Sequence, residues 1–206
     1  MTPSVISLSG YARTGKDTVF EVLQESCPGR VVRVAFADAV REFARDFYGV
    51  GDGTAEWWER HKEIPIHEVF WGDYYADPTG FHVAESSKKP YEETTGRDLL
   101  IHIGESMRAL QPDFWLDMGQ RAVEQALADG ADLVVVTDAR YRNEVQRMAE
   151  IGAATWLLTR PGTVALGSSD RAVDEIPRAL FDAHVANDGT LEDLRRKVAE
   201  ALGLAT

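Results

Sequence analysis

The sequence predicts an α/β layered fold in which helices cover a sheet of short strands. Two observations predict it. Runs rich in β-branched and apolar residues alternate along the chain with helical patterns. Two of these runs, LVVVT and TWLLT, are almost wholly apolar, which is typical of strands buried on both faces of a parallel sheet.

The elements follow one another in a regular order. We expect five strands, at 5–9, 31–36, 133–137, 154–159 and, more weakly, 184–186. We expect six helices, at 16–25, 39–48, 97–110, 114–129, 143–151 and 191–202. The start of the last helix is well marked, because Asn187-Asp188-Gly189 forms a turn, Thr190 can act as N-cap and Asp193 suits the first turn.

Composition limits the function classes. The 206 residues are 44% hydrophobic and 27% charged, which is enough for a core without disulfides. Cys27 is the only cysteine, so a reducing, cytoplasmic location is expected. The net charge of −12 repels nucleic acid and anionic lipid, and no apolar run approaches the roughly 20 residues that span a bilayer. We therefore expect no nucleic-acid or membrane partner.

Two segments interrupt the alternation within what we expect to be a single domain, 1–206. Residues 49–96 are rich in Gly, Pro, aromatic and charged side chains, and residues 161–177 contain several Gly and Ser. Long loops of this kind are usually lids or binding insertions. The aromatic side chains of 49–96 favour a small satellite core or a subunit interface, which leaves a homodimer as one option.

The strongest functional signal is a glycine-rich segment between the first strand and the first helix. It matches G-x-x-x-x-G-K and runs Gly10-Tyr11-Ala12-Arg13-Thr14-Gly15-Lys16-Asp17-Thr18. The glycines let successive backbone N–H groups face phosphate oxygens, and the helix that follows adds the positive end of its dipole. Lys16 can bridge the β- and γ-phosphates of a nucleotide. The alternative is a glycine-rich turn without a ligand.

The position after the lysine departs from the usual pattern. Asp17 stands where Ser or Thr usually binds Mg²⁺, and Thr18 follows it. Either the hydroxyl of Thr18 binds the metal, or Asp17 holds it through water.

A second polar cluster follows the third strand. Asp138 ends an apolar run, so it should lie at the carboxyl edge of the sheet, where it could bind or orient hydrated Mg²⁺. Arg140 comes two residues later and is a candidate for a guanidinium that binds phosphate. The alternative is a capped turn with an exposed ion pair.

These residues resemble the bacteriophage deoxynucleoside monophosphate kinases, in which Asp also follows the lysine of the phosphate loop. The likeness runs in order across most of the chain. It covers 9–10, 13–18, 35–38, 96–100, 103–104, 113–115, 137–140, 143–144, 160–162 and 187–191.

The resemblance implies a three-layer P-loop kinase fold, with the strand of the phosphate loop central in a five-stranded parallel sheet. It implies that ATP and Mg²⁺ bind at the phosphate loop and that a deoxynucleoside monophosphate is phosphorylated. Catalysis would then rest on Lys16, Arg13, Arg140 and Asp138, and the metal would be held by Asp17, Thr18 and Asp138. If a phage encodes the chain, its location is the host cytoplasm.

The resemblance also assigns the remaining site residues. The cofactor would be held by residues 10–18 and Arg160. The acceptor would meet Arg97 at its phosphate and Phe36 with Asp38 in its pocket, in or beside the insertion 49–96. Arg140 would also face the acceptor. The lid, 161–177, contributes Arg171 and Glu175, although Ala172 stands where the family pattern D-x-H-x-S-E has His.

Two other functions stay open at this point. The acceptor could be another small phosphorylated metabolite, such as dephospho-coenzyme A, because acceptor pockets vary more than phosphate loops. The chain could also be an interaction protein that binds ATP without catalysis, which the missing Ser or Thr after Lys16 favours. No N-K-x-D motif is present, which disfavours a regulatory GTPase.

Overall fold

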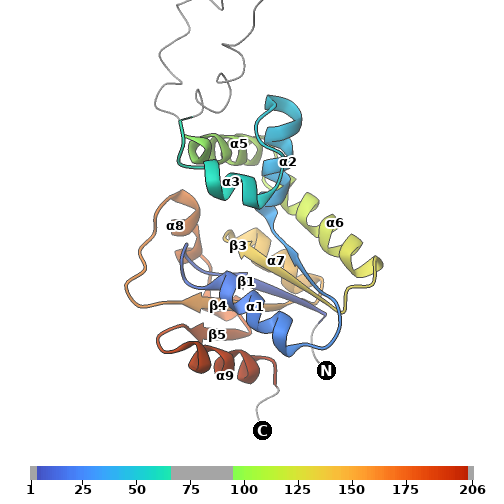
Figure 1. The fold of residues 1–206 in the computed structure, drawn as a ribbon, viewed down its shortest axis with the longest axis vertical. Coiled ribbons are helices and arrows are strands. Elements are labelled where there is room, and N and C mark those ends of the chain that lie inside the picture. Colours follow the sequence, from blue (N-terminus) through green and yellow to red (C-terminus); the bar gives the residue numbers. More distant parts are fainter. Residues whose placement is uncertain (1–3, 66–94, 204–206) are drawn as a thin grey trace, which may run out of the picture. The chain divides into compact units, whose positions relative to one another are not determined.

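The computed structural model describes residues 4–65 and 95–203 (Figure 1). The chain divides into two compact units, one formed by Met1–Phe36 with Leu116–Thr206 and the other by Ala37–Trp115. The first unit holds the sheet and the phosphate loop. The second is helical in its described part and includes the predicted insertion 49–96, of which residues 66–94 lie outside the described residues.

The first unit is built on a five-stranded sheet in the order β2-β3-β1-β4-β5. The strands are β1 (Val5–Ser9), β2 (Val31–Val34), β3 (Leu133–Ala139), β4 (Ala154–Thr159) and β5 (Ala183–Ala186). Every neighbouring pair is parallel. The strand that leads into the phosphate loop is therefore central, which confirms the predicted sheet.

Helices cover both faces of this sheet. They are α1 (Lys16–Ser26), α6 (Phe114–Ala128), α7 (Arg142–Glu150) and α9 (Leu191–Ala201). The unit also contains α8 (Ser168–Asp174) and a short 3₁₀ helix at Arg178–Leu180. At the start of α9, Thr190 Oγ1 accepts a hydrogen bond from Asp193 N at 3.2 Å, and Asp193 Oδ2 accepts one from Thr190 N at 2.9 Å. This capping box is the start signal expected from the sequence.

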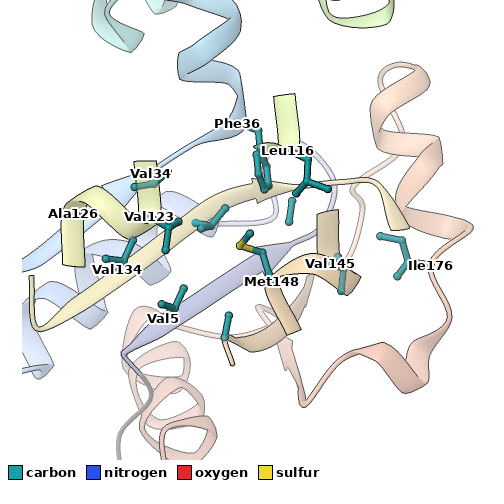
Figure 2. Close-up of a cluster of buried hydrophobic side chains, with 13 residues drawn as sticks. Val5, Val34, Phe36, Leu116, Val123, Ala126, Val134, Val145, Met148 and Ile176 are labelled. Atoms are coloured by element: carbon teal, nitrogen blue, oxygen red, sulfur yellow. The ribbon is translucent and has the colours of Figure 1, made fainter. Parts of the chain in front are cut away.

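Each face of the sheet has its own apolar core. On one face, residues of α1 and α9 such as Leu23 and Val198 pack on strand residues such as Val135. On the other, shown in Figure 2, Val123 of α6 and Met148 of α7 pack with residues of β1, β2 and β3. Two buried faces explain why the strands contain nearly continuous apolar runs.

The second unit contains α2 (Phe36–Tyr48), α3 (Ala55–His61) and α5 (Gly96–Leu110). Trp58 and Trp115 are buried, and Trp115 Nε1 donates to Gly104 O at 3.0 Å. A Cβ atom at Gly96 would lie 3.1 Å from the Trp58 ring, so a small residue there lets α5 start against it. Trp58 thus packs inside this unit, and the satellite core or subunit interface expected from the aromatic side chains of 49–96 stays a prediction.

The structure corrects the expected elements at three places. Helices α3 and α8 lie in segments where the sequence predicted none, and each has only seven residues, too few for a clear apolar period. The second strand ends at Val34, and Phe36 begins α2 instead of ending that strand.

Among the described residues, no helix is long and apolar enough to cross a membrane.

Candidate phosphate-binding site

The backbone of the phosphate loop needs its two motif glycines. Gly10 and Gly15 have φ angles of 145° and 100°, a region that favours glycine. A Cβ atom at Gly10 would overlap the carbonyl oxygen of Leu158, and one at Gly15 would lie 2.5 Å from Asn187 Nδ2. Arg13 also has a positive φ, of 66°. The motif spacing therefore corresponds to an observed loop geometry with no room for side chains at these glycines.

The loop is closed around the ammonium group of Lys16. Lys16 Nζ donates to Gly10 O at 2.9 Å and to Tyr11 O at 2.7 Å, and its side chain is nearly buried. Thr14 Oγ1 donates to the same Tyr11 carbonyl at 2.9 Å. An ammonium has three N–H donors, so these bonds leave one of them for a ligand.

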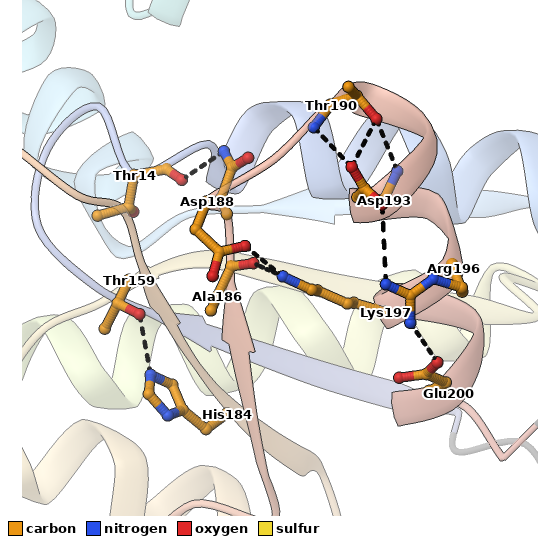
Figure 3. Close-up of polar contacts among 11 residues, drawn as sticks. Thr14, Thr159, His184, Ala186, Asp188, Thr190, Asp193, Arg196, Lys197 and Glu200 are labelled. Atoms are coloured by element: carbon orange, nitrogen blue, oxygen red, sulfur yellow. Dashed lines mark hydrogen bonds and ion pairs between the residues drawn. The ribbon is translucent and has the colours of Figure 1, made fainter.

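A side chain from the turn before α9 supports the loop from outside. Asn187 Nδ2 donates to Thr14 O at 3.0 Å, the contact that reaches Thr14 in Figure 3. The turn is itself held to α9, because Lys197 Nζ contacts Asp188 and donates to Ala186 O at 2.7 Å. The conformation of the phosphate loop thus depends on a segment more than 170 residues away.

The inner backbone donors of the loop are available to an anion. In the described part of the chain, no acceptor pairs with the N–H groups of Arg13, Gly15, Lys16 and Asp17. Gly15, Lys16 and Asp17 form the N-cap and first turn of α1, where N–H groups lack intrahelical partners and the helix dipole is positive, and Arg13 lies two residues before the N-cap. Free amides, a spare ammonium proton and a helix N-terminus together fit a phosphate chain.

The charge of Lys16 is held in an unfavourable environment. Burial is the main cause that lowers the pKa of Lys16 to about 8, and the nearby cation of Arg140 acts in the same direction, while Asp138, Asp170 and Asp17 oppose the shift. A bound polyphosphate would add negative charge and favour the ammonium form.

Asp138 lies at the carboxyl end of β3, as predicted. Its Oδ1 accepts a hydrogen bond from Phe36 N at 2.8 Å, so this carboxylate ties the end of β3 to the first residue of α2. The electrostatic effect of Asp138 on Lys16 places the two near each other. Its proposed role toward a metal stays a prediction.

The turn that carries Arg140 is capped by a carboxylate. Glu144 is buried, and its Oε2 accepts from Arg140 N at 2.8 Å and from Tyr141 N at 3.1 Å. The guanidinium of Arg140 pairs with Asp170 at 2.6 Å. The capped turn of the alternative interpretation is therefore present, but the ion pair is buried on one side, with Asp170 only 2% exposed.

The other predicted cations of the first unit are available. Within residues 4–65 and 95–203, Arg13, Arg160 and Arg171 form no ion pair, although the chain carries 34 acidic side chains. The side chain of Glu175 likewise has no hydrogen-bond or ion-pair partner in that part of the chain. These residues can turn toward a ligand, and their assignment to ATP or acceptor stays a prediction.

The predicted acceptor residues fall in different places. Phe36 belongs to the first unit, and its ring is buried in the core, where a Cβ atom on Gly119 would overlap it. The structure therefore gives this ring a packing role, and the prediction that it lines a pocket stays a prediction. Asp38 and Arg97 belong to the second unit, where Asp38 pairs with Arg41 at 2.5 Å and Arg97 with Glu63.

The predicted metal ligands could supply only a few of the coordination positions of Mg²⁺. No group of three or more His, Cys, Asp or Glu in the described residues could hold a metal ion. Asp17 is exposed and Thr18 is half-buried at the start of α1. Mg²⁺ at kinase sites is bound mostly by substrate phosphates and water, with one or two protein ligands, so these residues fit an ion that arrives with a nucleotide.

Sequence reasoning missed three side chains that shape this site: Asp170, Glu144 and Asn187. Glu144 carried a signal, because a Glu at the third helical position often caps the start of a helix. Asp170 and Asn187 act through contacts across more than 150 residues, which local patterns do not reveal.

The comparisons with known proteins add a relative of unassigned function. No family model matches the chain. The chain is 30% identical over 143 residues to "Uncharacterized protein ORF76" of Ictalurid herpesvirus 1 (strain Auburn), which covers 62% of this chain and 59% of that protein. The chain thus spans less than two thirds of the length of this curated relative.

Three solved structures resemble the chain weakly over nearly its whole length. TT1252 from Thermus thermophilus is 16% identical with a TM-score of 0.45, covering 100% of both chains. Dephospho-CoA kinase from Campylobacter jejuni is 11% identical with a TM-score of 0.43, covering 97% of this chain and 96% of that one. A sugar kinase from Janibacter sp. HTCC2649 is 12% identical with a TM-score of 0.39, covering 99% of each. Likeness at this level does not establish a shared activity. The strand order and the phosphate loop of the chain itself define it as an α/β fold with P-loop architecture.

Proposed function

We propose that this protein transfers the γ-phosphoryl group of ATP to a deoxynucleoside monophosphate, giving ADP and the deoxynucleoside diphosphate. The observation that carries the proposal is the phosphate loop, in which Lys16 Nζ is enclosed by Gly10 O and Tyr11 O beneath backbone amides without partners. Such a loop is suited to a polyphosphate, because its unpartnered amides and the remaining proton of Lys16 are all donors to phosphate oxygens.

The loop would bind the phosphates of ATP before any chemistry. The amides of Gly15, Lys16 and Asp17 offer donors, and Lys16 adds its remaining proton. Lys16 and these amides are already in place within a folded loop, so little ordering is needed on binding. That preorganisation is how an enzyme of this type stabilises charge that develops in the transition state.

The transfer step asks for positioning and charge neutralisation. An oxygen of the acceptor phosphate forms a bond to the γ-phosphorus, while the bond to the β,γ-bridging oxygen breaks and its electron pair leaves with ADP. Arg140, Arg13 and Arg160 supply cations near the carboxyl edge of the sheet. No general base is needed, since an ionised phosphate is the nucleophile. Mg²⁺, when bound, draws charge from the phosphates, and Asp17, Thr18 and Asp138 are the residues that would hold it.

The choice of acceptor rests on the family resemblance of the sequence. It assigns the acceptor phosphate to Arg97, at the second position of α5, and the nucleoside pocket to Asp38, in the first turn of α2. Arg97 contacts Glu63 through its guanidinium. An acceptor phosphate would compete with that exposed carboxylate for the same donors.

A coupled ADP-release assay with ATP, Mg²⁺ and a panel of acceptors tests the proposal. The panel holds the four deoxynucleoside monophosphates, the four ribonucleotides and dephospho-coenzyme A. We expect release with at least one deoxynucleotide and none without acceptor. Release with dephospho-coenzyme A alone would replace the proposed acceptor, and ATP binding without release would indicate a non-catalytic binding protein.

A pair of variants links any activity to the phosphate loop. Lys16→Met should abolish ADP release and weaken ATP binding, because it removes the ammonium that the loop encloses. Arg195→Met is the matched control, since it removes a cation from an exposed ion pair with Glu25 and should leave both unchanged. Wild-type turnover by Lys16→Met would refute the proposal.

A further inference from the structure

Asp170 is a buried carboxylate in the segment that the sequence predicted to be a lid, 161–177. It lies in α8 and is 2% exposed. A carboxylate in such a place destabilises a fold unless ion pairs and hydrogen bonds compensate for lost water. The Asp170 carboxylate therefore needs hydrogen-bond donors, and it accepts hydrogen bonds from three of them.

The donors come from three separate segments of the first unit. Asp170 Oδ1 accepts from Ala12 N of the phosphate loop at 3.0 Å and from Arg140 Nη1 at 2.6 Å. Asp170 Oδ2 accepts from Leu166 N at 3.0 Å. One side chain thus joins the phosphate loop, the turn after β3 and the segment that leads into α8.

The pairing leaves most of the Arg140 guanidinium for another ligand. Nη1 is engaged by Asp170 and, at 3.3 Å, by Ser169 Oγ, and the Arg140 side chain is 25% exposed. Within the described residues, Nε and Nη2 of Arg140 have no acceptor. A guanidinium offers five N–H donors in a rigid plane, so a bond that fixes one nitrogen also fixes the direction of the others.

A second contact ties α8 to the same loop. Tyr11 OH donates to Asp174 Oδ1 at 2.5 Å, one helical turn beyond Asp170. This contact is exposed, and the bonded carboxylate raises the pKa of Tyr11. Two successive turns of α8 therefore contact two successive residues of the phosphate loop.

We propose that Asp170 is the positioning residue of the transfer reaction: it holds Arg140 beside the phosphate loop so that Nε and Nη2 face the transferring phosphoryl group. The inference rests on the proposed function. Because the arginine is held before the nucleotide arrives, its contribution needs no reordering in the transition state. Asp170 itself touches no substrate, and its effect passes through Arg140.

The consequence is a loss of rate rather than of nucleotide affinity. Asp170→Asn keeps the size of the side chain and one acceptor oxygen but loses the charge that pairs with Arg140. We expect kcat to fall about 10- to 100-fold, with the KM for ATP changed less than threefold, because the loop amides and Lys16 still bind ATP. Asp182→Asn is the matched control: Asp182 Oδ2 accepts from Thr155 N and Thr155 Oγ1 at the opposite edge of the sheet. It should leave kcat unchanged.

A double-mutant cycle with Arg140→Ala distinguishes positioning from a general structural role. If Asp170 acts through Arg140, Asp170→Asn should lower kcat no further in the Arg140→Ala background. Circular dichroism establishes that each variant folds, and Asp170→Ser takes the place of Asp170→Asn if the latter does not. A kcat within twofold of wild type for the folded variant, or losses that multiply in the double variant, would overturn the inference. A wild-type protein that transfers phosphate to no acceptor would instead refute the proposed function.

Discussion

Lys16 gives a prediction that needs no nucleotide. Its ammonium is nearly buried and bonded to Gly10 O and Tyr11 O. Replacing it by Met keeps a chain of similar length and removes the charge. The ligand-free protein should then lose a pH dependence of stability that wild type possesses.

The sign follows from the two pKa values of the lysine. The folded pKa is about 8 and the ordinary value is 10.5, so between these limits the unfolded chain binds the proton more tightly. The free energy of unfolding of wild type therefore rises as pH increases through this window. Because one pH unit corresponds to about 1.4 kcal/mol, the full effect is about 3 kcal/mol. Below pH 8 the buried charge destabilises wild type by this amount.

Lys16→Met should reverse much of that destabilisation. The substitution removes the cost of burying charge but leaves two carbonyl groups without their donor, at about 1 kcal/mol each. Near pH 7 we therefore expect Lys16→Met to be about as stable as wild type or about 1 kcal/mol more stable. Other groups that titrate at alkaline pH affect both proteins alike, so the difference between them isolates Lys16.

Urea unfolding followed by circular dichroism, at several pH values between 7 and 10.5, measures this difference. From pH 7 to pH 10.5, the free energy of unfolding of wild type should rise by about 3 kcal/mol relative to that of Lys16→Met. Parallel pH profiles for the two proteins would show that the lysine is not held in a strained, buried state, and would refute the reasoning.

Two further predictions concern the support of the loop. Gly15→Ala should destabilise the fold by about 1 to 3 kcal/mol, because φ is 100° and the new Cβ would lie 2.5 Å from Asn187 Nδ2. It should also weaken ATP binding, measured by isothermal titration calorimetry, at least tenfold. Unchanged binding would contradict the observed loop geometry. Thr190→Ala should remove the cap of α9 and lower the free energy of unfolding, measured in urea, by about 1 kcal/mol. A loss of ADP release by the folded variant would show that the conformation of the phosphate loop depends on this cap as well as on Asn187.

The fold was largely predictable because its signals are local. Apolar runs such as LVVVT correspond to β3, and Thr190 with Asp193 marks the start of α9 as observed. Where local signals were weak, the prediction failed. Phe36 has a strand-like side chain, yet it begins α2, where Asp138 Oδ1 at the end of the neighbouring strand β3 accepts its N–H. Such a tertiary contact overrides local preference.

The candidate site was predictable in part, for a related physical reason. The loop motif required specific residues at fixed spacing, so Gly10, Gly15 and Lys16 were found from sequence. Asp170 was not, since nothing in the segment around it shows that Ala12 and Arg140 supply its donors. Residues of the loop motif are constrained locally, whereas residues that hold the loop in place are constrained by contacts distant in sequence.

The first unit concentrates its unfavourable groups at one edge of the sheet. Arg13 has a positive φ, Lys16 is a buried cation with a lowered pKa, and Asp170 is a buried anion beside Arg140. Elsewhere in this unit the strands and helices pack apolar faces together. Local violations of folding rules are expected where function requires them. A ligand that supplied negative charge would offset the cost of burying the Lys16 ammonium. Ligand binding should therefore raise the free energy of unfolding by more than the hydrogen bonds of the loop amides alone would raise it.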